Sequence, residues 1–86
     1  MTVLTREAAR AALIAAICAV APETDASALD PGRPLREQID IDSFDFLNVI
    51  IGLNTRVGIE VPERDYAEFR TLNGATDYLV RRSGGA

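Results

Sequence analysis

Residues 42–62 read DSFDFLNVIIGLNTRVGIEVP, and this stretch carries the strongest structural signal in the chain. At about 100° per residue, a helix over residues 43–57 gathers one apolar stripe on a single side. Its members are Phe46, Val49, Ile50, Leu53 and Val57. Gly58 is typical of the residue that ends a helix, and Pro62 suits the first turn of the next helix. The stretch predicts an amphipathic helix, a tight turn and a short second helix through Tyr66 and Phe69.

The same helix carries a second apolar stripe, roughly opposite the first. It consists of Phe44, Leu47 and Ile51, at spacings of i, i+3 and i+7. A small domain has little apolar surface to spare, so another part of the chain covers this stripe or a partner binds it.

The flanking segments predict two further helices and one long connection. The first helix begins after Thr5, a good N-cap, and ends before Pro22. Its apolar face consists of Ala9, Leu13, Ile17 and Val20. The last helix follows the cap Thr71 and ends at Arg81 and Arg82, where cations are favoured. Its apolar residues are Leu72, Ala75, Tyr78, Leu79 and Val80.

Residues 23–41 contain two prolines and a glycine and show no helical period. They predict a long ordered loop, anchored in the core by Leu29 and Leu35 and by Ile39 or Ile41. The predicted fold is all-α: a small four-helix bundle in one domain, residues 1–86, with a long loop between helices one and two and a short third helix. We expect residues 83–86 to fray.

The composition of the 86 residues excludes several classes of function. A net charge of −4 argues against a nucleic-acid partner, because phosphate binding needs a basic surface. Histidine is absent, so the usual general base is missing and we do not expect an enzyme. The single cysteine, Cys18, rules out an internal disulfide and a Cys/His metal site, and we expect it to be buried.

The apolar run around Cys18 is too short to span a membrane, and Glu7 in front of it argues against a signal peptide. These features predict a cytoplasmic protein, which we expect to be a monomer.

Ser43 stands between the long loop and the amphipathic helix, beside the second stripe. Asp42 or Ser43 is suited to be a plain helix cap, with nothing further implied. The surroundings of the serine, however, suggest a second interpretation.

Here the chain resembles the acyl carrier proteins, four-helix domains that carry 4′-phosphopantetheine. Asp42-Ser43-Phe44 nearly matches the Asp-Ser-Leu signature of that family. The other matching segments are Leu35-Arg36-Glu37, Gly58-Ile59-Glu60-Val61-Pro62-Glu63, and Thr71-Leu72 through Tyr78-Leu79. Together these segments cover most of residues 29–82 in the correct order and spacing.

The resemblance implies that Ser43 is the attachment site. A phosphopantetheinyl transferase (holo-carrier synthase) would move the group from coenzyme A onto the hydroxyl, with Asp42 helping to position the transferase's magnesium-bound coenzyme A. The thiol of the arm would hold acyl groups as thioesters for acyl-activating, condensing or acyl-transfer enzymes. The linking phosphodiester is an anion and suits the positive end of a helix. The docking surface implied for these partners consists of Phe44, Asp45, Leu47, Asn48 and Ile51.

Some positions depart from the family pattern. Asp40 replaces a usual glycine, and Phe46 stands where a small residue is common, which predicts a fuller interior. Glutamates of the fatty-acid carriers are replaced at four positions: Asn48, Asn54, Thr55 and Arg56. Weaker acidic steering favours a specialised lipid, polyketide or related pathway over housekeeping fatty acid biosynthesis. The alternative is a helical adaptor that is never modified and uses the second stripe to bind a partner.

Overall fold

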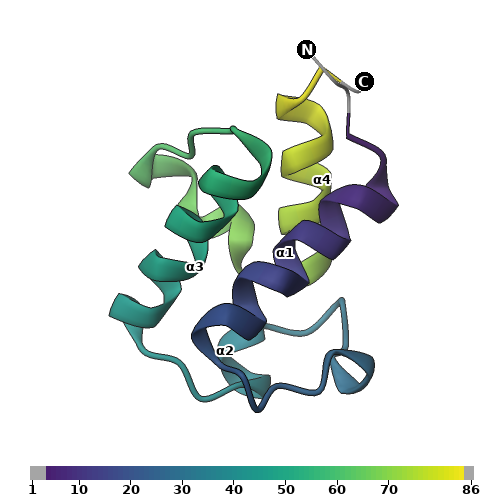
Figure 1. Ribbon diagram of the computed structural model, residues 1–86. Helices are drawn as coiled ribbons and strands as arrows, with labels where there is room; N and C mark the ends of the chain where they lie inside the picture. The colour runs from purple at the N-terminus through teal and green to yellow at the C-terminus, as the bar shows by residue number, and fades with distance from the viewer. Residues whose placement is uncertain (1–3, 85–86) are drawn as a thin grey trace.

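The computed structural model describes residues 4–84, and this part of the chain is helical with no strand. Its elements in order are α1 (Arg6–Val20), η1 (Ala26–Ala28), α2 (Leu35–Gln38), α3 (Ser43–Val57), η2 (Glu63–Phe69) and α4 (Leu72–Arg82). Helix α1 packs against both α3 and α4, which lie on either side of it, and η2 packs against α4 (Figure 1). The predicted all-α bundle is confirmed, with the 3₁₀ helix η2 as its short third helix.

The helix ends follow from local side-chain chemistry. The hydroxyl of Thr5 accepts a hydrogen bond from the amide of Ala8 at the start of α1. Thr71 does the same for the amide of Gly74 at the start of α4, over 3.0 Å. Helix α3 ends at Gly58, whose φ of 71° lies in the left-handed region that favours glycine. These predicted ends are all confirmed.

The segment predicted as a loop without helix contains η1 and α2, so that prediction was wrong in part. The single turn of α2 is too short to show a helical period in the sequence. Backbone hydrogen bonds to residues distant in sequence hold this turn and the segment before it in place. The amide of Leu35 donates to the carbonyl of Arg70 over 2.9 Å, and the amide of Asn73 donates to Pro31 over 3.0 Å. The loop is thereby fastened to the start of α4.

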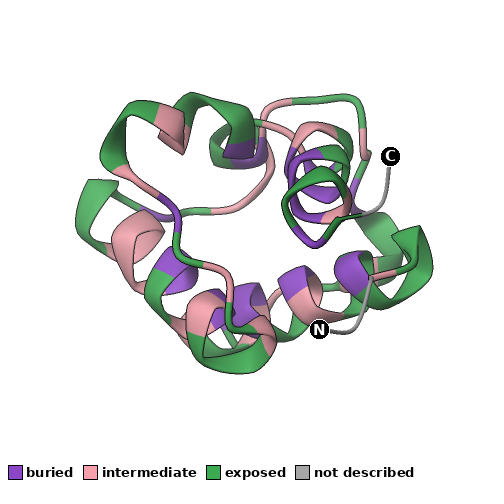
Figure 2. Cartoon of the chain, turned by 90° about the horizontal axis from the view of Figure 1, so that it is seen from above, coloured by how far each residue is buried: buried purple, intermediate pink, exposed green. Residues whose placement is uncertain are grey.

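The core lies between the inward faces of the helices, as Figure 2 shows. The predicted core residues that are buried are Ala9, Leu13, Ile17, Leu29, Leu35, Ile41, Val49, Ile50, Leu53, Leu72, Ala75, Tyr78 and Leu79; Val61 and Phe69 are buried as well. The predicted residues Val20, Ile39, Phe46, Val57 and Val80 are only partly buried, at the margin of this cluster, and so is Ile59. Cys18, predicted to be buried, is likewise of intermediate exposure.

Ser83 corrects the prediction of a frayed tail. It is buried, its hydroxyl accepts a hydrogen bond from the amide of Leu4 over 2.9 Å, and it donates to the carbonyl of Val80. This residue therefore joins the two ends of the described chain. Residues 85–86 lie outside the described residues.

A buried tyrosine fastens η2 to α4. The phenol of Tyr78 donates to the carboxylate of Asp65 over 2.8 Å and accepts from the guanidinium of Arg82. Burial, assisted by the bond to Asp65, raises the pKa of Tyr78 above its ordinary value of 10.0. The phenol therefore stays protonated at neutral pH and keeps its role as donor.

Gly74 lies where α4 packs closely against η2. A Cβ atom at this position would stand 2.8 Å from the carbonyl oxygen of Glu68 and 3.1 Å from the hydroxyl of Thr71. Gly74→Ala, although it raises helix propensity, should therefore lower the free energy of unfolding by about 1–3 kcal/mol through overpacking. Urea unfolding followed by circular dichroism measures the difference.

Gly52→Ala in α3 is the matched control. Its Cβ would meet only the flexible end of Arg56 at 3.3 Å and the Cβ of Ala16 at 4.0 Å, so we expect no loss of stability. If Gly74→Ala proves as stable as the Gly52→Ala protein, the close packing of η2 on α4 is disproved.

Candidate functional site

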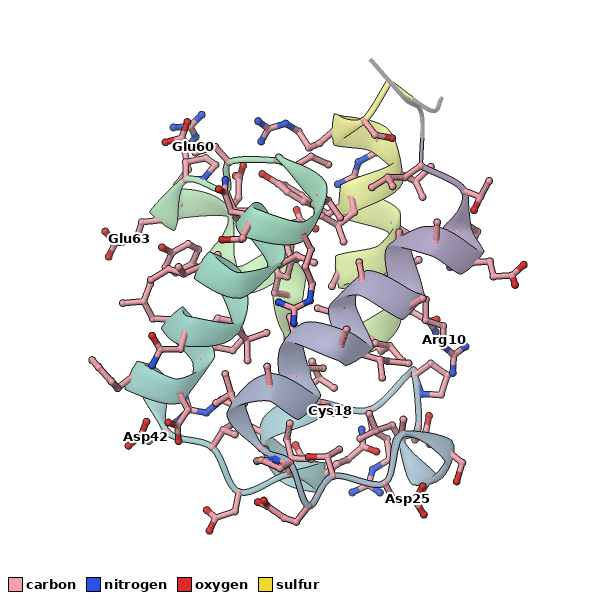
Figure 3. The ribbon with its side chains drawn as sticks, in the orientation of Figure 1. Arg10, Cys18, Asp25, Asp42, Glu60 and Glu63 are labelled. Atoms are coloured by element: carbon pink, nitrogen blue, oxygen red, sulfur yellow. The ribbon has the colours of Figure 1, made fainter. Side chains whose placement is uncertain are left out.

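The start of α3 is fixed by a capping box. The carboxylate of Asp42, the N-cap residue, accepts from the amide of Asp45 over 2.8 Å, and the carboxylate of Asp45 accepts from the amide of Asp42 over 3.3 Å. The sequence left open whether Asp42 or Ser43 is the N-cap of this helix, and the structure shows that it is Asp42. Figure 3 shows Asp42 at the start of α3, on the outside of the bundle.

Ser43 is therefore the first residue of the helix, and its hydroxyl is not used as a cap. The residue is exposed, and its Oγ lies 3.5 Å from Nη1 of Arg36, which donates toward it from α2. The first amides of a helix have no partner within the helix and give its start a partial positive charge. An exposed hydroxyl, the positive end of a 15-residue helix and a guanidinium group meet here. This set of donors fits a phosphodiester anion attached to Oγ.

The second stripe of α3, Phe44, Leu47 and Ile51, together with the neighbouring Asn48, forms a surface that we call the outer face. Phe44 and Ile51 are exposed, whereas Leu47 and Asn48 are of intermediate exposure. Phe44 is 70% exposed and Ile51 is 54% exposed, the only large hydrophobic residues among residues 4–84 that are so open. Exposed apolar residues on one face are typical of a surface that binds a partner.

Three other polar residues of α3 do not stand free on the outer face. Asp45 is partly buried and held in the capping box. The side chain of Asn54 donates to the carbonyl of Ile59 over 2.9 Å, and Arg56 donates back to the carbonyl of Gly52 over 3.2 Å. The outer face therefore carries no charged residue among its four members, and Asn48 is its one polar side chain.

On the other side of Ser43 lies a cleft of about 400 Å³ between α2, α3 and η2. It is lined chiefly by Pro34, Arg36, Glu37, Phe46, Tyr66 and Arg70. The rings of Phe46 and Tyr66 meet edge to face, with centroids 6.4 Å apart, and form the aromatic part of the wall. Phe46 thus borders an open cleft and does not fill the centre of the bundle.

Sequence reasoning did not identify Arg36 as a neighbour of the serine. The two residues are seven positions apart, and only the turn of α2 brings the guanidinium to the hydroxyl. The one available signal in the sequence was an arginine seven positions before the serine. Among residues 4–84 there is no cluster of three or more His, Cys, Asp or Glu side chains suited to a metal ion. In the same range no helix is long and apolar enough to cross a membrane.

Comparisons with known proteins agree with this arrangement. The family described as "Phosphopantetheine attachment site" matches residues 11–79. The acyl carrier protein of Rubrobacter xylanophilus is 32% identical over 56 residues, which are 65% of this chain and 69% of that protein. The acyl carrier protein of Tropheryma whipplei (strain Twist) is 30% identical over 44 residues, 51% of this chain and 54% of that protein. That of Acidothermus cellulolyticus is 24% identical over 60 residues, 70% of this chain and 71% of that protein. No solved structure matches the chain significantly.

Because the matched residues form most of the chain, the protein belongs to the family of phosphopantetheine attachment domains. The prosthetic group of this family is 4′-phosphopantetheine. The chain spans 69% and 54% of the first two relatives named above.

The capping box predicts how stability responds at Asp42. Asp42→Ala removes the acceptor for the amide of Asp45 and should lower the free energy of unfolding by about 1 kcal/mol. Asp42→Asn keeps an acceptor oxygen and should cost only a few tenths of that amount. Urea unfolding of the three proteins measures both differences. Equal stability of wild type and Asp42→Ala would contradict the assigned cap.

Proposed function

We propose that the protein is an acyl carrier whose 4′-phosphopantetheine is attached to Ser43. The observation that supports this most directly is the exposed hydroxyl at the first position of α3, which is not used as a cap because Asp42 is the cap. The family membership supplies the group, and three similar proteins are named acyl carrier proteins.

In the proposed attachment step a transferase brings coenzyme A to the start of α3. Oγ of Ser43 attacks the phosphorus that bears the pantetheine, and the bond from this phosphorus to the 3′,5′-ADP portion breaks. The hydroxyl proton passes to a base of the transferase, and 3′,5′-ADP leaves. When attached, the group supplies a terminal thiol that holds acyl groups as thioesters. In this proposal the chain itself is a carrier and not an enzyme.

Asp42 has a second proposed role beside capping. Its carboxylate is exposed at the edge of α3, next to the hydroxyl that is modified, and would help to place the transferase's magnesium-bound coenzyme A. Asp42→Asn separates the two roles, because it keeps the cap and removes the charge.

The outer face is the proposed docking surface for the transferase and for acyl-activating, condensing or acyl-transfer enzymes. Phe44, Leu47, Asn48 and Ile51 offer apolar contact and one amide, and Asp45 at their edge adds a carboxylate. A surface of this kind is recognised by shape and apolar contact more than by charge. We therefore propose a specialised lipid, polyketide or related pathway in the cytoplasm.

The attachment site is tested by intact mass after incubation with coenzyme A, magnesium and a broad-specificity phosphopantetheinyl transferase. We expect the wild-type mass to rise by one phosphopantetheine and the mass of Ser43→Ala to stay unchanged. Ser27→Ala, which removes an exposed hydroxyl from η1, is the matched control and should be modified fully. A folded wild-type protein that its host's own transferase also leaves unmodified would disprove the carrier and favour a non-modified adaptor.

Docking is tested by truncating the exposed side chains of the outer face. Phe44→Ala and Ile51→Ala should each change the free energy of unfolding by only about 0.5 kcal/mol, since both side chains are exposed. Each should lower kcat/KM for modification by about tenfold if it is a central contact. Ala15→Ser, on the exposed side of α1, controls for a general surface effect. Unchanged kcat/KM in both variants would exclude the outer face as the surface that the transferase recognises.

A further inference from the structure

Ser43 lies between two different surfaces of the molecule. On a helix, residues three and four positions apart are neighbours, so Phe46 and Leu47 flank Ser43 on its two sides. Leu47 belongs to the outer face, whereas Phe46 lines the cleft. An arm attached to Oγ can leave the serine toward either surface, and the side chains around the serine determine which direction is favoured.

The charges around the serine are unequal on the two sides. Arg36 lies on the side of the cleft, with Nη1 3.5 Å from Oγ of Ser43. A phosphorus atom bonded to Oγ carries its free oxygens within reach of a guanidinium at this distance. Guanidinium groups bind phosphate oxygens with charge-assisted hydrogen bonds, often in pairs. The outer face presents no cation next to the serine.

The lining of the cleft contains two arginines and one carboxylate. Arg36 and Arg70 both line it, and neither forms an ion pair within residues 4–84. The only carboxylate of the lining, Glu37, lies 3.9 Å from Arg33, which stands outside it. The cleft thus combines cationic groups with the aromatic wall of Phe46 and Tyr66, and its volume of about 400 Å³ suits a small ligand.

We propose that Arg36 binds the phosphodiester of the arm on Ser43 and directs the arm into this cleft, away from the outer face. The inference rests on the proposed attachment to Ser43. Arg36 acts here as a positioning residue that holds the first anionic segment of the arm, while the outer face stays free for the docking enzyme. Because Arg36 is exposed, the contact should weaken as salt concentration rises.

The test compares nuclear magnetic resonance spectra of the unmodified and the modified protein. Attachment should shift the side-chain Nε–H signal of Arg36 and the signals of Phe46 and Tyr66, with smaller changes at Ile51. In Arg36→Gln the ³¹P signal of the phosphodiester should move away from its wild-type position, and Arg36→Lys should restore part of the difference. High salt should bring the wild-type ³¹P signal toward that of Arg36→Gln.

Arg10→Gln is the control, because it removes the same charge from α1 on the side of the molecule away from Asp42 (Figure 3). The ³¹P signal of modified Arg10→Gln should coincide with that of the modified wild-type protein. A protein that never gains the group refutes the proposed function and this inference together. A modified protein refutes this inference alone if Arg36→Gln leaves the ³¹P signal in place, or if the outer face responds in place of the cleft.

Discussion

The capping box between Asp42 and Asp45 sets the residue at which α3 begins, and the place of Ser43 in the site depends on that start. A helix that starts at Ser43 turns Val49, Ile50 and Leu53 into the core. A start displaced by one residue would leave this stripe in place but would change which residue is the cap. The capping box therefore matters most for Ser43, which it leaves as an exposed first residue with a free hydroxyl.

Contacts with α1 and the anchoring of α2 fix the position of α3 in the bundle. Helix α1 packs along α3, and Gly58 ends α3 so that the chain returns through η2 to α4. The backbone bonds from Leu35 to Arg70 and from Asn73 to Pro31 hold α2 beside the serine. The site thus stands at a junction of three separately anchored segments, and it presents an apolar face on one side and a basic cleft on the other.

Much of the fold could be predicted because its signals are local. Thr5, Gly58 and Thr71 act through their own hydroxyls or backbone angles, and each marked a helix end correctly. The buried stripe of α3 followed from periodicity. Helix α2 was missed because bonds to residues distant in sequence hold it in place, and propensity does not report such bonds.

The residues of the site that lie on α3 could be predicted from local sequence signals, whereas the residue contributed by α2 could not. The period of the helix placed Phe44, Leu47 and Ile51 on one side of it but left open whether the chain covers them; the structure shows Phe44 and Ile51 exposed and Leu47 partly buried. Ser43 is exposed as well. Their roles stay predictions until the protein is modified and its partners are bound. Arg36 could not be found from the sequence, because its place beside the serine depends on how a separate helix is anchored.

Attachment of the group to Ser43 is tested most directly by peptide-level mass spectrometry of the protein purified from its own host, without added transferase. Fragmentation identifies both the attached group and the residue that carries it. We expect 4′-phosphopantetheine, with or without an acyl group on its thiol, on the peptide that contains Ser43 and on that residue. The same group on another residue, or only unmodified Ser43 in cells that contain active transferase, would contradict this expectation.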